Sequence, residues 1–154
     1  ASQPTQVSAA HISFAQPSWN TPTSVSEAIT RTFASASQAQ AVAAHEAILN
    51  AVANNHAGTY YHIALPVVAE LCQALPSASP WAQFAAVEAL VDLCGSFEPE
   101  PEHAIINSPT SGLPIALREA LVAQVALSRP TLSTIVGAGG PAAASATSLL
   151  AVIE

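Results

Sequence analysis

A helix-like segment that occurs twice constrains the fold more than any other feature of this sequence. Residues 43–49 read AAHEAIL and residues 85–91 read AAVEALV, at a spacing of 42 residues. In each copy one stripe of side chains recurs at positions i, i+3, i+4 and i+7, the spacing of one face of an amphipathic helix. The matching sets are His45, Ile48, Leu49 and Val52 in the first copy and Val87, Leu90, Val91 and Cys94 in the second.

A third, weaker copy of the stripe lies near the C-terminus. It consists of Ala146, Leu149, Leu150 and Ile153, displaced by 59 residues from the second copy. The 17 additional residues are about the length of a Glu- and Pro-rich loop that lies between them. A pair of helices cannot bury its apolar face alone, whereas stacked pairs form a continuous core and an open, curved surface. A repeat near 42 residues is typical of HEAT and armadillo arrays.

Start and stop signals divide the chain into helices. We expect them at residues 24–35, 37–54, 64–75, 80–95, 113–128, 130–137 and 140–154. Ser24 with Glu27, and Ser37 with Gln40, have the spacing of capping boxes, and Ser79 precedes a proline at the first helical position. No segment alternates with a period of two for long enough to predict a strand. The prediction is an all-α fold of about seven helices, arranged as a short right-handed α-solenoid.

Two segments are expected to lie outside the helices. Residues 1–23 are rich in Ser, Thr, Gln and Pro, and we interpret them as an irregular arm that docks by its aromatic side chains. The helical repeat domain then spans residues 24–154. Residues 96–112 form a loop whose alternating segment Glu98-Pro99-Glu100-Pro101-Glu102 is predicted to be extended and solvated.

The charge of the chain restricts its partners. Ten acidic residues face three arginines and no lysine, which gives a net charge of -7. A protein that binds a phosphate backbone needs a basic face, so this composition argues against nucleic-acid binding and favours a basic protein partner. Two cysteines are too few for a disulfide framework and are interpreted as buried thiols in a reducing compartment, the cytoplasm. No segment reads as a membrane span.

A family resemblance extends this interpretation. Residues 60–71, YYHIALPVVAEL, followed by residues 86–93, AVEALVDL, resemble bacterial HEAT-repeat proteins. In that family an aromatic residue, an Ala, a Pro and paired aliphatic residues open a helix ahead of a Leu-rich partner helix. Several small members lie beside polymorphic toxins and act as immunity proteins, and this resemblance implies a similar role here. It covers residues 37–97, and this chain departs from the family in its few arginines and its long acidic loop after Gly95.

Residues that suggest catalysis or metal binding have simpler interpretations. His45-Glu46 lacks the second His of a zincin pair, because position 49 is Leu49. We interpret His45 as a partly buried residue of the core stripe, with Glu46 in solvent. His56 and His62 flank a turn without a Cys or Asp at metal spacing. Both cysteines lie among Leu and Val, which disfavours a nucleophilic role. The sequence therefore predicts no catalysis, no metal and no cofactor.

The residues that remain suggest a partner-binding surface. Glu88 and Asp92 lie one helical turn apart, which fits either a solvated polar face or contact with a basic partner. Trp81 begins its helix, where it is either an exposed anchor or a staple between repeats. The surface predicted to bind the partner consists of Tyr60, Tyr61, Trp81, Glu88, Asp92, Glu98, Glu100 and Glu102.

Three classes of function are consistent with these features. The first is a non-enzymatic module that binds and occludes a partner toxin. The alternative is a structural or self-assembling scaffold, in which the charge-poor C-terminal helix pairs with a second copy. The third, less favoured, is a HEAT-type enzyme that acts on nucleic acid, for which three arginines do not supply the basic groove.

Overall fold

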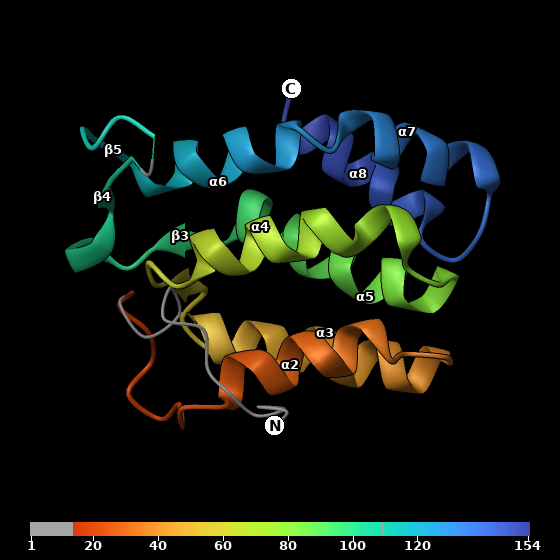
Figure 1. Ribbon diagram of the computed structural model, residues 1–154, viewed down its shortest axis with the longest axis horizontal. Coiled ribbons are helices and arrows are strands. Elements are labelled where there is room, and N and C mark those ends of the chain that lie inside the picture. The colour runs from red at the N-terminus through yellow and green to blue at the C-terminus, as the bar shows by residue number, and fades with distance from the viewer. Residues whose placement is uncertain (1–13, 109) are drawn as a thin grey trace, which may run out of the picture.

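The computed structural model describes residues 14–108 and 110–154 (Figure 1). Within these ranges the chain is mainly helical and forms seven α-helices, which confirms the helical class and the number predicted. They are α2 (Ser24–Phe33), α3 (Gln38–Val52), α4 (Ala64–Ala74), α5 (Pro80–Val91), α6 (Leu117–Ala126), α7 (Arg129–Ala138) and α8 (Ala143–Val152).

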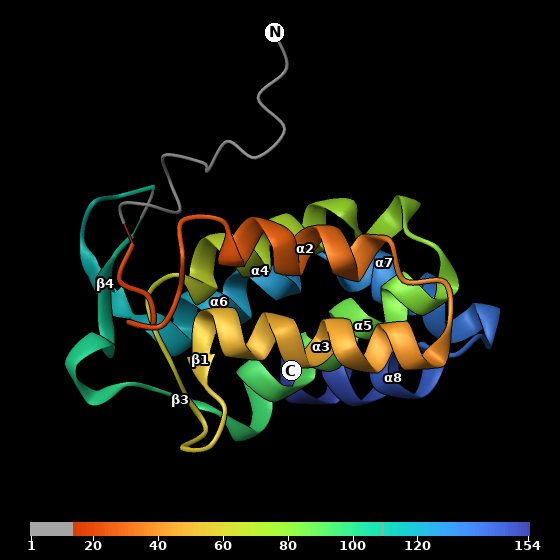
Figure 2. The same cartoon turned by 90° about the horizontal axis from the view of Figure 1, so that it is seen from below.

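The helices are stacked in three tiers. In Figure 1, α2 and α3 form the lowest tier, α4 and α5 the middle tier, and α6, α7 and α8 the upper tier. Seen from below in Figure 2, α2, α4 and α7 lie on one side, while α3, α5 and α8 lie on the other. Helix α3 packs against α5 and α5 packs against α8, whereas α4 packs against α6. Neighbouring tiers therefore pack through α3, α5 and α8 on one side and through α4 and α6 on the other, while α2 contacts α5 more than α4.

The stripes predicted from the repeat lie in the interior. Ile48, Leu49 and Val52 of the first copy are buried, as are Val87, Leu90 and Cys94 of the second and Ala146, Leu149 and Ile153 of the third. His45, Val91 and Leu150 are partly buried. Because equivalent positions of α3, α5 and α8 are buried together, the duplication of the sequence corresponds to repeated packing of similar helical faces.

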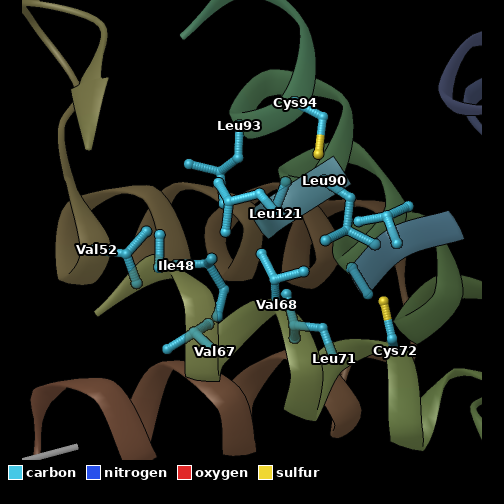
Figure 3. Packing of buried hydrophobic residues seen from close by; sticks show 14 of the residues in the cluster. Ile48, Val52, Val67, Val68, Leu71, Cys72, Leu90, Leu93, Cys94 and Leu121 are labelled. Atoms are coloured by element: carbon cyan, nitrogen blue, oxygen red, sulfur yellow. The ribbon is translucent and has the colours of Figure 1, made fainter. Parts of the chain in front are cut away.

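The centre of the core is aliphatic. Figure 3 shows Ile48 of α3, Val68 and Leu71 of α4, Leu90 of α5 and Leu121 of α6 meeting between the tiers, and each is 0% exposed. Burying one such side chain contributes about 1.5–3 kcal/mol relative to leaving it in water. The core thus obtains its stability from Leu, Ile and Val, as a composition with few aromatic residues requires.

The predicted helix caps have mixed outcomes. The Ser37 cap is confirmed, because the backbone N–H of Gln40 donates to the Ser37 hydroxyl at 3.2 Å. The reciprocal bond of the predicted box differs: the Gln40 amide oxygen accepts from the N–H of Ala36, at 2.8 Å, and not from that of Ser37. The Ser24 box is wrong, because the Ser24 hydroxyl accepts from the N–H of Thr21 and is unavailable to cap the helix. Thr23 is the N-cap residue instead.

Ser79 occupies its predicted position without capping by its side chain. Helix α5 begins at Pro80, but the Ser79 hydroxyl donates to the carbonyl of Ser35 at 3.2 Å, in the connection between α2 and α3. At the other end α5 continues as a single π-helical segment, η2 (Asp92–Ser96), rather than stopping at Gly95. Sequence spacing alone does not distinguish an α-helical last turn from a π-helical one.

The prediction that the chain has no strands is wrong. β1 (Ala53–Asn54), β2 (Thr59–Tyr60) and β3 (Glu98–Pro99) form one small sheet, in which β2 pairs antiparallel with β1 and parallel with β3. β4 (Ile105–Asn107) and β5 (Pro114–Ala116) form an antiparallel pair. Short 3-10 segments lie at η1 (Leu75–Ser77) and η3 (Pro101–His103). Strands of two or three residues are too short to produce a recognisable alternation.

The described part of the N-terminal arm docks on the first tier. Phe14 packs against the core, and the carbonyl of Ala15 accepts from the N–H of Ile63 at 2.9 Å. The Trp19 indole N–H donates to the carbonyl of Asn50 at 2.8 Å, and the Asn20 amide donates to that of Ala51 at 2.7 Å. These bonds satisfy carbonyls at the end of α3, which lack partners within the helix. The remainder of the predicted arm, residues 1–13, lies outside the described residues.

Candidate functional site

The acidic segment 98–102 is held against a turn. The N–H of Glu98 donates to the carbonyl of Gly58 at 2.9 Å, and that of Glu100 donates to the carbonyl of Tyr60 at 2.8 Å. The Thr59 hydroxyl also donates to the Glu100 carboxylate. Pro99 has no N–H, and the N–H groups of Glu98 and Glu100 on either side of it donate to the β2 turn, which suits an edge strand. The prediction of an extended, solvated segment is confirmed in part, because β3 is extended and Glu98, Pro101 and Glu102 are exposed, but the segment is paired with the β2 turn and ends in the 3-10 segment η3.

Two carboxylates of this segment, those of Glu100 and Glu102, lie near an aromatic group. Glu98 and Glu102 are exposed, Glu100 is half-buried, and the half-buried Tyr61 follows β2 directly. The Tyr61 ring lies 5.6 Å from the imidazole of His103, centroid to centroid. Partial burial of the phenol, together with the nearby Glu100 and Glu102, raises the pKa of Tyr61. We call Tyr61, Glu98, Glu100 and Glu102 the acidic end.

Two histidines, His62 and His103, lie beside the acidic end. The rings of His62 and His103 meet edge to face, with centroids 5.0 Å apart, and Nε2 of His62 lies 2.9 Å from the carbonyl oxygen of Ile105 in β4. These contacts join the β2 turn to the segment that leads into the β4–β5 pair. His103 was not identified from the sequence, since only its three-dimensional proximity to Tyr61 and His62 indicates its role.

Arg118 contacts the chain just before the acidic segment, but its guanidinium bonds to backbone carbonyls and not to carboxylates. Its guanidinium donates to the carbonyl of Cys94 at 2.8 Å and to that of Phe97 at 2.5 Å. Both carbonyls belong to the chain that joins α5 to β3. Arg118 therefore fixes the start of the acidic segment and does not pair with its carboxylates.

Tyr60 was predicted as a surface anchor and is instead completely buried, with 0% of its surface exposed. Successive side chains of a strand point to opposite sides, so Tyr60 points into the core while Thr59 is only half-buried. Tyr61, which follows the strand, is half-buried and packs against the core cluster. Within the described residues the Tyr60 hydroxyl has no hydrogen-bond partner. Burial, partly offset by the charge of Arg118, raises the pKa of Tyr60 to about 12.

We expect Tyr60→Phe to stabilise the protein by about 1 kcal/mol at neutral pH, because it removes a buried hydroxyl without a partner. The phenol has its ordinary pKa of about 10 in the unfolded chain and a pKa of about 12 in the folded chain. Ionisation of Tyr60 therefore leaves the free energy of unfolding unchanged below pH 10 and lowers it as the pH rises from 10 to 12. Between pH 10 and pH 12 the free energy of unfolding of Tyr60→Phe should fall less steeply than that of the wild type, and the two slopes should differ by up to about 1.4 kcal/mol per pH unit.

Urea unfolding of both proteins from pH 7 to pH 12 measures the two effects. A loss of stability at neutral pH would mean that the Tyr60 hydroxyl makes a favourable bond, and equal slopes for the two proteins would contradict its raised pKa.

Glu88 and Asp92 lie on one face of the α5 segment but reach in opposite directions. Asp92 Oδ2 lies 2.7 Å from Nε2 of His45 on α3, and the Ser145 hydroxyl of α8 donates to Glu88 at 2.5 Å. Both carboxylates are half-buried and link the middle tier to the tiers on either side. His45 is partly buried and Glu46 is exposed, which confirms the interpretation of this dipeptide as part of a core stripe.

Trp81 is a staple between helices. Its half-buried ring meets Phe84 edge to face with centroids 5.4 Å apart, and it packs against a small buried cluster formed by Ala41, Ala44 and Ala85. This cluster joins α3 to α5. Of the eight residues predicted to bind a partner, the structure thus brings together Tyr61 and the three glutamates of segment 98–102. Trp81, Glu88 and Asp92 have contacts between helices.

The described residues offer few groups for catalysis. Cys72 and Cys94 are buried and unpaired, which confirms them as core thiols. Burial raises the pKa of Cys72 and brings that of Cys94 to about 12, so both remain protonated at neutral pH. Within residues 14–108 and 110–154, no three His, Cys, Asp or Glu side chains are grouped to hold a metal ion. No helix in these ranges has the length and apolar character to span a bilayer.

Comparison with models of protein families, with curated proteins and with solved structures finds no match.

Proposed function

We propose that this chain is a non-enzymatic protein-binding module that occludes a basic partner protein, in the manner of an immunity protein that neutralises a toxin. The observation that carries the proposal is the acidic end at the edge of the first sheet, where the carboxylates of Glu100 and Glu102 lie near the half-buried phenol of Tyr61 and Glu98 is exposed on the same segment. Arg118, which holds the chain that leads into this segment, donates to backbone carbonyls and pairs with none of the three carboxylates. The exposed carboxylates of Glu98 and Glu102 are thus left to attract an external cation, while Glu100 accepts from the Thr59 hydroxyl.

The chemistry of the acidic end suits an arginine or lysine of the partner. A cation over the Tyr61 ring would interact with the face of the ring and with Glu100 and Glu102 at once. Carboxylates on the rim of an interface mainly increase the association rate and the selectivity, whereas an aromatic anchor contributes affinity. A net charge of -7 acts in the same direction, because it steers the whole molecule toward a basic protein.

We also propose that the stacked helices form a short α-solenoid. Buried stripes shifted by 42 residues, and tiers that pack through equivalent helices, support a short solenoid of HEAT-like pairs. Such a stack offers an extended surface for a protein partner rather than a deep pocket. Two buried, unpaired thiols are compatible with a reducing cytoplasm, where we place this activity.

A capture experiment with a charge-matched control tests the proposal. The test variant carries Glu98→Gln, Glu100→Gln and Glu102→Gln, and the control carries Glu46→Gln, Glu119→Gln and Glu154→Gln, which remove the same charge from exposed positions elsewhere. We expect wild type and control to capture the same basic protein from the native host at low salt. The association rate of the test variant should be lower by about tenfold or more.

The captured protein must also behave as a toxin. We expect its expression alone to arrest growth and co-expression of the wild-type chain to restore growth, with weaker restoration by the test variant. Equal binding of the test and control variants would remove the acidic end from the proposal. A partner whose toxicity is unaffected by this chain would contradict the immunity role.

A further inference from the structure

A groove runs along the first tier between α2 and α3. Two hollows, of about 370 and 270 Å³, lie along it and share Arg31 as a lining residue. Alanines are frequent among the other lining residues, with Ala34, Ala39 and Ala43 in the larger hollow and Ala47 in the smaller. Since α4 and α5 cover the opposite side of this tier, the groove is on the outer side of the stack (Figure 1).

The exposed row of α2 contains one positive and one negative charge. Glu27, Thr30, Arg31 and Ala34 are exposed and have the spacing of one helical face. Arg118 and Arg129 donate to backbone carbonyls, whereas the Arg31 guanidinium makes no hydrogen bond or ion pair with the described part of the chain. Glu27 lies four residues earlier, which is about 6 Å along the helix axis. Its carboxylate accepts only from the Thr23 hydroxyl, at 2.9 Å.

The charges beside the groove balance. Glu27 and Arg31 together are neutral, so the net charge of -7 resides entirely on other residues. Two copies that meet through this groove therefore place no net charge at the contact. A helix row with Glu and Arg one turn apart is also complementary to itself when the second copy runs antiparallel.

We propose that the α2–α3 groove is a docking site for a second copy of this chain, in a two-fold symmetric dimer. Helix α2 of each copy lies antiparallel to α2 of the other across the two-fold axis, and the small alanine side chains that line the groove beside it permit close approach of the backbones. Glu27 of each copy then faces Arg31 of the other. The acidic end remains outside this contact, so the dimer is independent of the proposed partner binding.

Sedimentation equilibrium over a wide range of concentration, with charge-reversed variants, tests the dimer. We expect the wild-type mass to rise from one chain toward two. Arg31→Glu and Glu27→Arg each place like charges opposite one another twice, so each should weaken the dimer by about tenfold or more. Arg129→Glu and Glu119→Arg make the same changes of charge on α7 and α6 and should leave the dimer intact.

Combining the two reversals restores the complementary charges. A mixture of the Arg31→Glu and Glu27→Arg proteins should form mixed dimers, and a single chain that carries both changes should dimerise with itself. A wild-type chain that stays monomeric at every concentration overturns the proposal. A dimer that is indifferent to Arg31→Glu, or a mixture that fails to associate, overturns the antiparallel arrangement. Far-UV circular dichroism of each variant verifies that the fold is retained.

Discussion

Replacing Leu90 with alanine is expected to lower the free energy of unfolding by about 3–4 kcal/mol, the cost of a cavity at the centre of an aliphatic core. Leu90 is 0% exposed and lies where α5 meets side chains of α3, α4 and α6 (Figure 3). The loss includes both the transfer of the missing methyl groups and the contacts of the surrounding side chains, which relax only partly. Urea denaturation followed by circular dichroism measures this difference.

Leu127→Ala is the matched control, because it makes the same chemical change at a leucine that is 75% exposed. Its effect should remain within about 0.5 kcal/mol. Similar losses for the two variants would contradict the placement of α5 at the centre of the stack.

Arg118→Met is expected to lower the free energy of unfolding by about 3 kcal/mol and to loosen the acidic segment. The change preserves much of the apolar length of the side chain but leaves the carbonyls of Cys94 and Phe97 without their charged donor. A hydrogen bond to a charged group contributes about 1.5–3 kcal/mol. Amide exchange at Glu98 and Glu100, whose N–H groups pair with the β2 turn, should become faster.

Arg129→Met provides the comparison for this variant. Arg129 is exposed and makes one hydrogen bond, at 3.2 Å, to the carbonyl of Ile153. We expect a loss below about 1 kcal/mol and unchanged exchange at Glu98 and Glu100. If Arg118→Met leaves exchange at these two amides unchanged, then Arg118 does not fix the acidic segment.

The helical part of the fold could be predicted because its signals are local. The apolar spacing around Leu49 and Val87, the Ser37 cap and the prolines at positions 66 and 80 each act within one helix, and the structure places helices there. Burial of the repeated stripes follows from the same periodicity. These features depend on residues within one or two turns of each other, which a sequence displays directly.

The candidate site could be predicted only in part because its contacts join distant segments. Tyr60 and Tyr61 are adjacent and chemically identical, and only the two-residue strand β2 places one in the core and the other beside the glutamates. His45 meets Asp92 across 47 residues, and Ser145 meets Glu88 across 57. No local pattern contains such pairings, so the sequence could not predict that Asp92 and Glu88 bond to side chains of other helices.

The alternation of glutamate and proline in segment 98–102 has a consequence for recognition. β3 is an outer strand of its sheet, and Pro99 and Pro101 occupy the positions whose nitrogens face away from β2. That edge therefore lacks the N–H donors that an added strand needs. Other chains cannot extend the sheet there by regular backbone pairing, which protects an exposed edge from aggregation. A partner that approaches the acidic end must recognise its side chains, so its selectivity depends on sequence rather than on a general affinity for extended backbone.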